Sequence, residues 1–261
     1  MQTFADIDFL DENTRFFGNE VEQINIKKVS TGSRLIIEEA ESLKKIKVLT
    51  PGITICFSEF PTNTVEIDGP IEEVTIKHNG LDCSIHDRYI SNHTLPLQQT
   101  WGAIITTDAN IISNYDSIII KNDGEEEICV DHDYMNIAII GDLSLKSVNI
   151  NGKRLIESFI IYQADNLQKV RINRRVLSCT LRRCPKINSI SGFGDLLRLN
   201  PAPPVDNQLS IGGYWNEVPY DYEMLRSTLS IANFESCRTA NEIYTCSDMG
   251  GIFIRPYNYN N

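Results

Sequence analysis

The sequence predicts a mainly β protein, folded as a parallel repeat solenoid with a short C-terminal α+β cap. Three observations predict this class. A six-residue apolar pattern recurs along most of the chain of 261 residues. Two positions that flank the pattern recur with it. Many of the apolar runs are rich in isoleucine and valine, which favour β-structure.

The recurring hexamer reads apolar-x-x-apolar-x-apolar, as in "LKKIKV" from Leu43 and "LQKVRI" from Leu167. Its last three residues alternate between inward and outward positions, as a short strand requires. Copies begin 20 to 28 residues apart, except across one long interval with room for about three more units. The other copies are "VEQINI" from Val21, "IEEVTI" from Ile71, "LKSVNI" from Leu145, a weaker "INSISG" from Ile187 and a partial "EEEICV" from Glu125.

The flanking positions are a small residue three before the hexamer and an apolar residue ten after its start. The small residues are Gly18, Ala40, Ala164 and Cys184, with Asp68 and Asp142 as exceptions; the apolar residues are Ile53, Leu81, Leu155, Leu177 and Leu197. One such unit cannot enclose a core, but stacked units share a continuous apolar column beside a parallel sheet. The alternative is a β-sandwich in which the spacing is coincidental.

The chain changes character at "NPAPPVDN", residues 200–207, where prolines stop regular structure. We therefore expect a solenoid with an N-terminal cap over residues 1–200 and a capping segment over 201–261. Within that segment, residues 220–234 have the apolar spacing of a helix, and "EIYTCSDMGGIFIRPY" indicates two short strands around a Gly-Gly turn. A separate functional C-terminal domain is the alternative.

The pattern small-x-x-L-x-x-I-x-I, followed by an apolar residue, resembles the BspA-like variety of leucine-rich repeat over residues 18–200. "CPKINSIS", with Cys184 and Ile187, has the C-x-x-L element of that family. The units here are irregular: the asparagine common eight residues after the first leucine occurs once, as Asn79, and the proline common in such units is missing at its positions. The resemblance implies a leucine-rich-repeat-like stack that serves as a recognition scaffold.

Composition narrows the function classes. A net charge of -11 disfavours general affinity for nucleic acid or anionic membranes. No apolar run is long enough to span a membrane. The seven cysteines have no C-x-x-C spacing, and the N-terminus has no signal-peptide pattern. We expect a cytoplasmic protein with reduced thiols, or one exported without a cleavable signal.

Few residues have the pattern of a catalytic or metal site. "CSIHDR" offers Cys83, His86 and Asp87, and "VDHDY" offers Asp131, His132 and Asp133, both of which contain zinc-ligand types. Such a site requires stacked repeats to bring the clusters together, so we interpret them as polar loop residues. Cys184 occupies the small inward position, which indicates a packed thiol rather than a nucleophile. We expect no catalytic residue, metal or cofactor.

The strongest functional signal is a basic segment. Between Leu167 and Asn200 the chain carries eight lysines and arginines against one acidic residue, Asp195. Strand alternation predicts that Lys169 and Arg171 face outward, as should Lys45 and Lys47 in their own repeat. The predicted partner-binding residues are Lys45, Lys47, Lys169, Arg171, Arg174, Arg175, Arg182 and Arg183.

This basic surface supports three hypotheses. It binds an acidic protein, with arginine making paired contacts to carboxylates; it binds phosphate in a nucleic acid or headgroup; or it pairs with the chain's own acidic segments such as "DGEEE", within one molecule or in a dimer. We expect a non-enzymatic protein-binding scaffold for an acidic partner, such as an inhibitor, immunity-type protein or adaptor. The alternatives are a nucleic-acid or phosphate binder, and a carbohydrate-active or metal-assisted β-helix enzyme.

Overall fold

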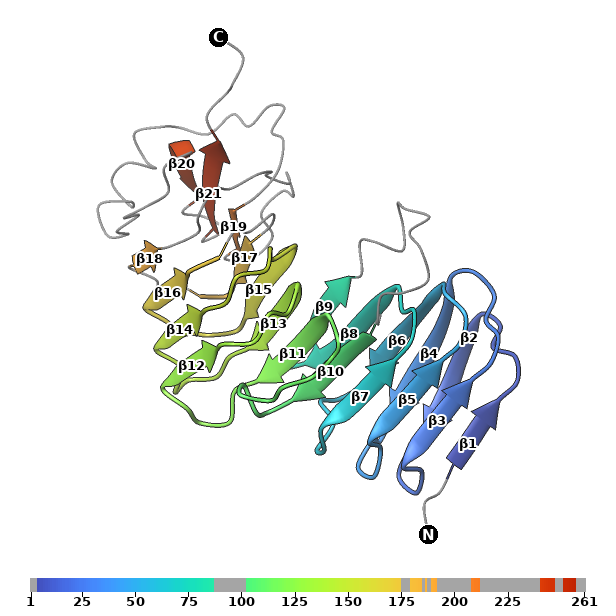
Figure 1. Cartoon of the computed structure of the whole chain (residues 1–261). Helices are drawn as coiled ribbons and strands as arrows, with labels where there is room; N and C mark the ends of the chain where they lie inside the picture. The colour runs from blue at the N-terminus through green and yellow to red at the C-terminus, as the bar shows by residue number, and fades with distance from the viewer. Residues whose placement is uncertain are drawn as a thin grey trace. The chain divides into compact units, whose positions relative to one another are not determined.

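The structure, a computed structural model, describes residues 4–86, 102–174, 179–184, 186, 189–191, 208–211, 240–246 and 251–256. The chain divides into two compact units (Figure 1). The first holds residues 1–108 and 112–121, and the second holds 109–111 and 122–261. Throughout the described residues the regular elements are strands, without a helix. The prediction of a mainly β, parallel repeat solenoid is therefore confirmed.

The first unit winds between two sheets of parallel strands. One sheet contains β1 (Phe4–Ile7), β3 (Gln23–Ile26), β5 (Lys45–Val48) and β7 (Val65–Asp68), followed by β10 (Gly102–Thr106) and β11 (Ser117–Lys121). The other contains β2 (Asn13–Phe17), β4 (Ser33–Glu38), β6 (Ile53–Phe57), β8 (Glu73–His78) and β9 (Leu81–His86). The direction reverses at β9, antiparallel to β8, and at β10, antiparallel to β7.

The second unit has the same two-sheet construction. One sheet contains β12 (Glu127–Val130), β14 (Ser147–Ile150), β16 (Lys169–Ile172) and β18 (Ser189–Ser191), all parallel. The other contains β13 (Asn136–Ile140), β15 (Ser158–Tyr162) and β17 (Cys179–Arg182), continued by β19 (Gln208–Ile211), β21 (Gly251–Pro256) and β20 (Ala240–Cys246). The expected C-terminal strand pair is present: β20 and β21 run antiparallel, with Cys246 opposite Gly251.

Aligned aliphatic side chains form the interior of each unit. In the first unit the register places Ile24, Ile46 and Ile67 in one row, all 0% exposed. In the second, Val148 and Val170 are aligned in the same way and at most 1% exposed. Burying one such side chain contributes about 1.5–3 kcal/mol. The stack is therefore stabilised coil by coil, as expected of a solenoid.

The hexamer residues lie in this interior, but one copy is out of phase. Leu43, Leu145 and Leu167 are 0% exposed and Ile71 is 3% exposed. Leu43 leads into β5, whereas Ile71 leads into β8 in the opposite sheet of the same unit. The prediction that "IEEVTI" is the next equivalent of "LKKIKV" is therefore wrong.

The strand that does follow β5 in its sheet is β7, where the hexamer pattern is lost. Lys45 aligns with Glu66, so that the equivalent of Leu43 is Thr64 and the equivalent of Val48 is Gly69. A Cβ on Gly69 would lie 1.9 Å from the carbonyl oxygen of Val48, which excludes an aliphatic residue there. Strands of both sheets alternate inward and outward, so one hexamer can match either sheet.

The flanking positions have mixed outcomes. Ala164 is buried, and Gly141 faces it so closely that an added Cβ would lie 2.6 Å from the Ala164 Cβ. Ile53 and Leu81 begin strands and are buried, but Leu155 is only half-buried. Leu177 and Leu197 lie outside the described residues, as do the boundary at 200–207 and the helix expected over 220–234.

The acidic N-terminal residues belong to the stack itself. β1 and β2 are the first strands of the two sheets of the first unit, paired parallel to β3 and β4.

Across the described residues, no helix is long and apolar enough to cross a membrane.

Candidate partner-binding surface

The outward side of β16 presents two cations, Lys169 and Arg171. Burial alternates along the strand, so that both are exposed while Val170 and Ile172 face the interior. This is the orientation that the sequence predicts. We call the outward side of β14, β16 and β18 around these two residues the β16 face.

The strands beside β16 bring no carboxylate to the two cations. Lys169 is aligned with Ser147 on β14 and Ser189 on β18. Arg171 is aligned with Asn149 and Ser191. Within the described part of the chain, neither cation forms an ion pair. Their charges are therefore exposed to an external partner.

A ladder of polar side chains holds Arg171 in place. Its Nε donates a hydrogen bond to Asn173 Oδ1 at 3.1 Å. Asn173 Nδ2 donates to Asn151 Oδ1 at 2.6 Å, and Asn151 Nδ2 donates to Asp131 Oδ1 at 2.8 Å. This ladder was not among the sequence predictions, although its signal is visible in the sequence: an Asx residue stands directly after β12, β14 and β16.

The acidic residues of "DGEEE" contact residues in and next to β14, not the cations of β16. Glu126 is paired with Lys146, whose Nζ lies 2.5 Å from its Oε1. Glu127 accepts a hydrogen bond from Asn149. β12 and β16 are separated by β14, so about 10 Å divides their backbones. The described contacts therefore give no support to neutralisation of β16 by this segment within one unit.

Arg174 does not belong to the exposed surface, and its assignment there is wrong. It is 3% exposed, and its guanidinium donates to three backbone carbonyls: Nε to Arg154 at 2.6 Å, Nη2 to Tyr134 at 2.6 Å and Nη1 to His132 at 3.4 Å. Burial lowers the pKa of Arg174 to about 10. The residue directly after a strand can turn inward when a turn offers free carbonyls, and strand alternation does not predict this.

The remaining arginines are not on the β16 face. Arg182 is half-buried and ends β17, in the other sheet, and Arg183 is half-buried with a φ of 56°. This agrees with the expectation that both lie on the returning side of the coil. Arg175 lies outside the described residues. The β16 face therefore depends on Lys169 and Arg171.

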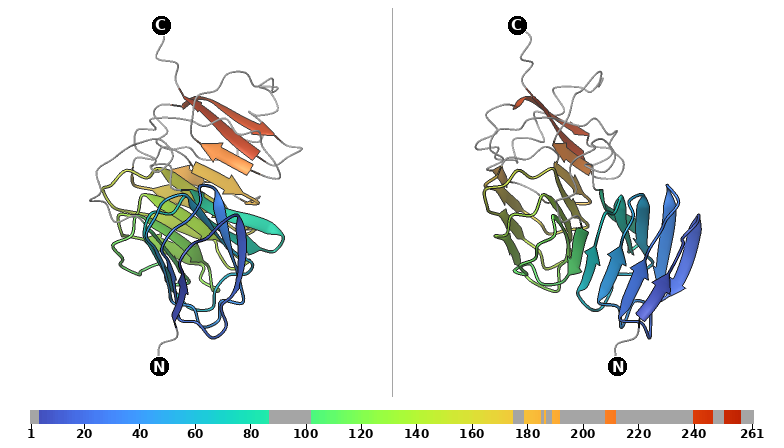
Figure 2. Two further views of the ribbon diagram at one scale, coloured as in Figure 1. Left: turned by 90° about the vertical axis from the view of Figure 1, so that its right-hand side faces the viewer. Right: turned by 45° about the vertical axis from the view of Figure 1, so that its right-hand side comes forward.

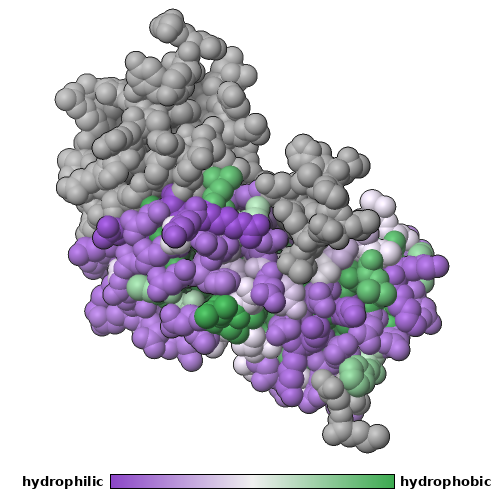
Figure 3. Space-filling view, viewed as in Figure 1, coloured by the Kyte–Doolittle hydropathy of each residue, from purple (hydrophilic) through white to green (hydrophobic). Residues whose placement is uncertain are grey.

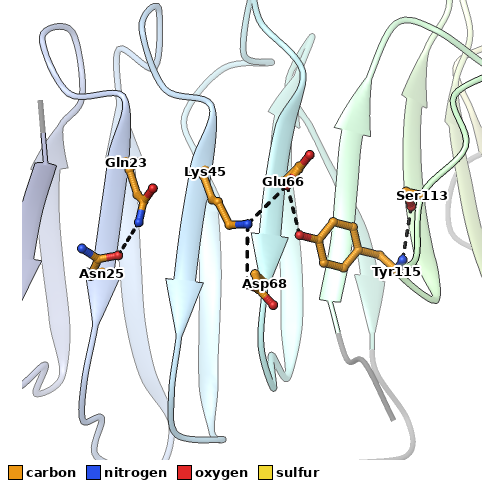
Figure 4. A network of polar contacts seen from close by, with 7 residues as sticks. All are labelled: Gln23, Asn25, Lys45, Glu66, Asp68, Ser113 and Tyr115. Carbon is orange, nitrogen blue, oxygen red and sulfur yellow. Dashed lines mark hydrogen bonds and ion pairs between the residues drawn. The ribbon is translucent and has the colours of Figure 1, made fainter. Parts of the chain in front are cut away.

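Lys45 and Lys47, in the first unit, have different surroundings. The Lys45 ammonium lies 3.5 Å from Glu66 and 3.6 Å from Asp68, and the Tyr115 hydroxyl donates to Glu66 at 3.2 Å. Figure 4 shows this network, which joins β5, β7 and Tyr115, and a separate hydrogen bond between Gln23 and Asn25 on β3. Lys47 is exposed and aligned with Asp68. This face is charge-balanced, so these two lysines are weaker candidates than Lys169 and Arg171.

The residues of the two candidate metal clusters are packed in the core, exposed, or hydrogen-bonded to the backbone. Cys83 is 1% exposed and faces the interior, whereas His86 is exposed on the same strand, 3.6 Å from Glu73. Asp87 lies outside the described residues. Asp133 accepts from the backbone N–H groups of residues 153 and 154 at 2.7 and 3.1 Å. Within the described residues, no group of three His, Cys, Asp or Glu could hold a metal ion.

The fold and this surface define the class of protein: it is a β-solenoid in which one strand, β16, carries two outward cations that form no ion pair among the described residues. Figure 3 shows that hydrophilic side chains cover most of the described surface in that view. No protein-family model, no curated protein and no solved structure matches the chain.

Proposed function

We propose that the chain is a non-enzymatic protein-binding scaffold that holds an acidic protein surface against the β16 face. The observation that carries this proposal is the pair Lys169 and Arg171, two residues apart on one outward side and without a carboxylate on either neighbouring strand. Strand geometry places their backbones about 7 Å apart. The planar guanidinium of Arg171 suits paired contacts to a carboxylate.

The rigidity of the surface supports a recognition role. Val170 and Ile172 are packed in the core, and Asn173 holds the Arg171 side chain. A partner therefore meets a guanidinium that is already positioned, which lowers the entropic cost of binding. Cations without an ion-pair partner also attract an acidic partner before contact, which raises the association rate at low salt.

Phosphate or nucleic acid is the second candidate for the same cations. Sequence-tolerant binding of single strands combines a basic groove with aromatic residues on which bases stack. The residues aligned with Lys169 and Arg171 are serines and asparagine. The absence of an aromatic residue among these aligned positions favours carboxylate over nucleic acid.

The test compares two probes of equal charge, a glutamate-rich peptide and an oligothymidylate. Fluorescence anisotropy with the full chain should show tighter binding of the peptide, and the double variant K169E/R171E should bind it at least about tenfold more weakly. The double reversal K28E/K77E is the matched control, because Lys28 and Lys77 are exposed in the first unit. Binding of the peptide that K169E/R171E leaves unchanged, or tighter binding of the oligonucleotide, would overturn the proposal.

A native partner is tested in the same way. Proteins that co-purify with the chain from its own host are isolated and titrated with wild type, K169E/R171E and K28E/K77E at low and moderate salt. Loss of binding in the double variant alone supports the β16 face as the contact. Turnover of a substrate that disappears in His132→Ala would instead support the enzyme alternative.

A further inference from the structure

The first coil of the first unit leaves a strand edge without a partner. Across the described residues, β1 pairs only with β3, and β2 pairs only with β4. Figure 2 shows β1 and β2, in dark blue, at the end of the stacked strands of this unit. Such an edge presents backbone N–H and C=O groups that can pair with another strand.

The apolar interior is open at the same end. Ile7 is aligned with Ile26, and Phe16 with Ile37. Ile26 and Ile37 are 0% and 1% exposed, yet Ile7 and Phe16 in the equivalent positions are only half-buried. The difference is that, within the described part of the chain, no further coil covers Ile7 and Phe16. A strand added at this end would extend the interior column by one layer.

Exposed aromatic residues gather on this coil. Half of the large apolar side chains that are exposed in the described residues come from residues 4–17: Phe4 at 54%, Phe9 at 58% and Phe17 at 64%. Natural proteins protect edge strands with lysine, proline or a covering element. β1, with the sequence "FADI", has neither lysine nor proline.

The charges around the edge indicate the kind of segment that would fit. Residues 4–17 contain four carboxylates against one cation, Arg15. Between internal strands of this unit, a cation faces carboxylates: Lys45 on β5 lies near Glu66 and Asp68 on β7. A second copy of the chain would bring its own Asp6 to the Asp6 of the first, and like charges opposite each other are destabilising. The edge therefore favours a basic segment over a second copy.

We propose that β1 binds an extended segment of a partner protein in which lysine or arginine alternates with aliphatic residues. The segment adds as a further strand, its cations beside Asp6 and its aliphatic side chains over Ala5 and Ile7. The backbone supports this geometry: the N–H of Lys27 donates to the Ile7 carbonyl at 2.9 Å, so Ile7 turns its polar groups toward β3. The backbone N–H and C=O groups of neighbouring residues in a parallel strand point to opposite sides, so those of Asp6 point toward the free edge.

The experiment uses two fluorescein-labelled peptides of identical composition. In one, lysine alternates with isoleucine and valine; in the other, the order is shuffled so that the alternation is lost. The full chain should bind the alternating peptide at least about tenfold more tightly, because only that peptide can place its aliphatic side chains on one side. Hydrogen exchange of the β1 amides should slow when it binds.

Variants at one position separate the contributions. Asp6→Lys should weaken binding about tenfold through repulsion. Asp6→Pro should abolish it, because proline lacks the N–H at the free edge. Asp6→Asn keeps an acceptor for Asn25 Nδ2, which lies 2.7 Å from Asp6 Oδ1, and removes only the attraction, so its binding should fall between wild type and Asp6→Lys. Glu20→Lys is the control, because Glu20 is exposed beyond the end of β2.

Two results would overturn the proposal. Equal binding of both peptides would show that charge alone attracts them, without strand addition. Sedimentation that shows a concentration-dependent dimer of the wild-type chain, lost in Asp6→Pro, would assign the edge to a second copy. The β16 face is far along the sequence from β1, so K169E/R171E should bind the alternating peptide as wild type does.

Discussion

The guanidinium of Arg174 donates from Nη2 to the backbone carbonyl of Tyr134 at 2.6 Å, across 40 residues of sequence. Tyr134 is itself 0% exposed, and its hydroxyl donates to the Ile111 carbonyl at 2.7 Å. Arg174 therefore connects successive coils of the second unit through backbone atoms. A cation that the sequence assigns to a binding surface is instead part of the interior.

Replacing Arg174 with methionine should destabilise the second unit by about 3–5 kcal/mol. The change removes the charged donor from the buried Tyr134 carbonyl and from the part-buried Arg154 and His132 carbonyls, and the loss of such a donor is costly. The measurement is urea unfolding of the full chain. Arg171→Met is the matched control and should change stability by about 0.5 kcal/mol or less, because Arg171 is exposed. Equal losses in the two variants would contradict the buried role of Arg174.

Acid should weaken the second unit through Asp133. Hydrogen bonds from the backbone N–H groups of Arg154 and Lys153 lower the pKa of Asp133, and the charge of Arg174 adds to this. A carboxyl whose folded pKa is lowered contributes stability above its unfolded pKa, about 4, and loses it as the pH falls through the folded pKa. Asp133→Asn should therefore be less stable than wild type at pH 7, with the difference shrinking below about pH 4.

Urea midpoints measured from pH 7 down to pH 2 check this. Asp165→Asn, at an exposed aspartate of the same unit, provides the control for a general change in charge. A gap between wild type and Asp133→Asn that stays constant over this range would exclude the proposed linkage.

The sequence predicts the strands of this fold better than their assignment to sheets. Alternation within a hexamer is local, so β5, β14 and β16 follow directly from it. The sheet to which a strand belongs depends on the length of every turn before it. Ile71 matches the hexamer and is buried, yet it enters the second sheet of its unit, because turns of unequal length intervene.

The candidate surface divides in the same way. Lys169 and Arg171 lie within a strand, where alternation determines the outward side. Arg174 lies beyond the strand end, where the direction of a side chain depends on which backbone groups need donors. Lys45 is on the predicted side, but its neutralisation by Glu66 and Asp68 requires the register of β5 against β7. A hexamer pattern contains no information on that register.

Gly141 packs closely against the next coil, so a substitution there tests the packing between coils. An alanine there would place its Cβ 2.6 Å from the Ala164 Cβ and 2.9 Å from the Ala164 Cα. Gly141→Ala should cost about 1–3 kcal/mol through overpacking. The double variant with Ala164→Gly should recover part of this loss, since it removes one of the two contacts. Thermal unfolding of the two single variants and the double variant gives the coupling, and strict additivity would exclude contact between the positions.

The thiol of Cys184 provides a chemical test of the same interior. Burial raises the pKa of Cys184 to about 12, and its Sγ lies 3.5 Å from the Arg182 carbonyl, to which it donates. A raised pKa keeps the thiol protonated at pH 8, and the thiolate is the reactive form. Iodoacetamide should therefore label Cys184 at least about tenfold more slowly in the folded chain than in urea, as peptide mass spectrometry can measure. Rapid labelling of the folded chain would instead reveal an activated thiol and favour the enzyme alternative over the scaffold.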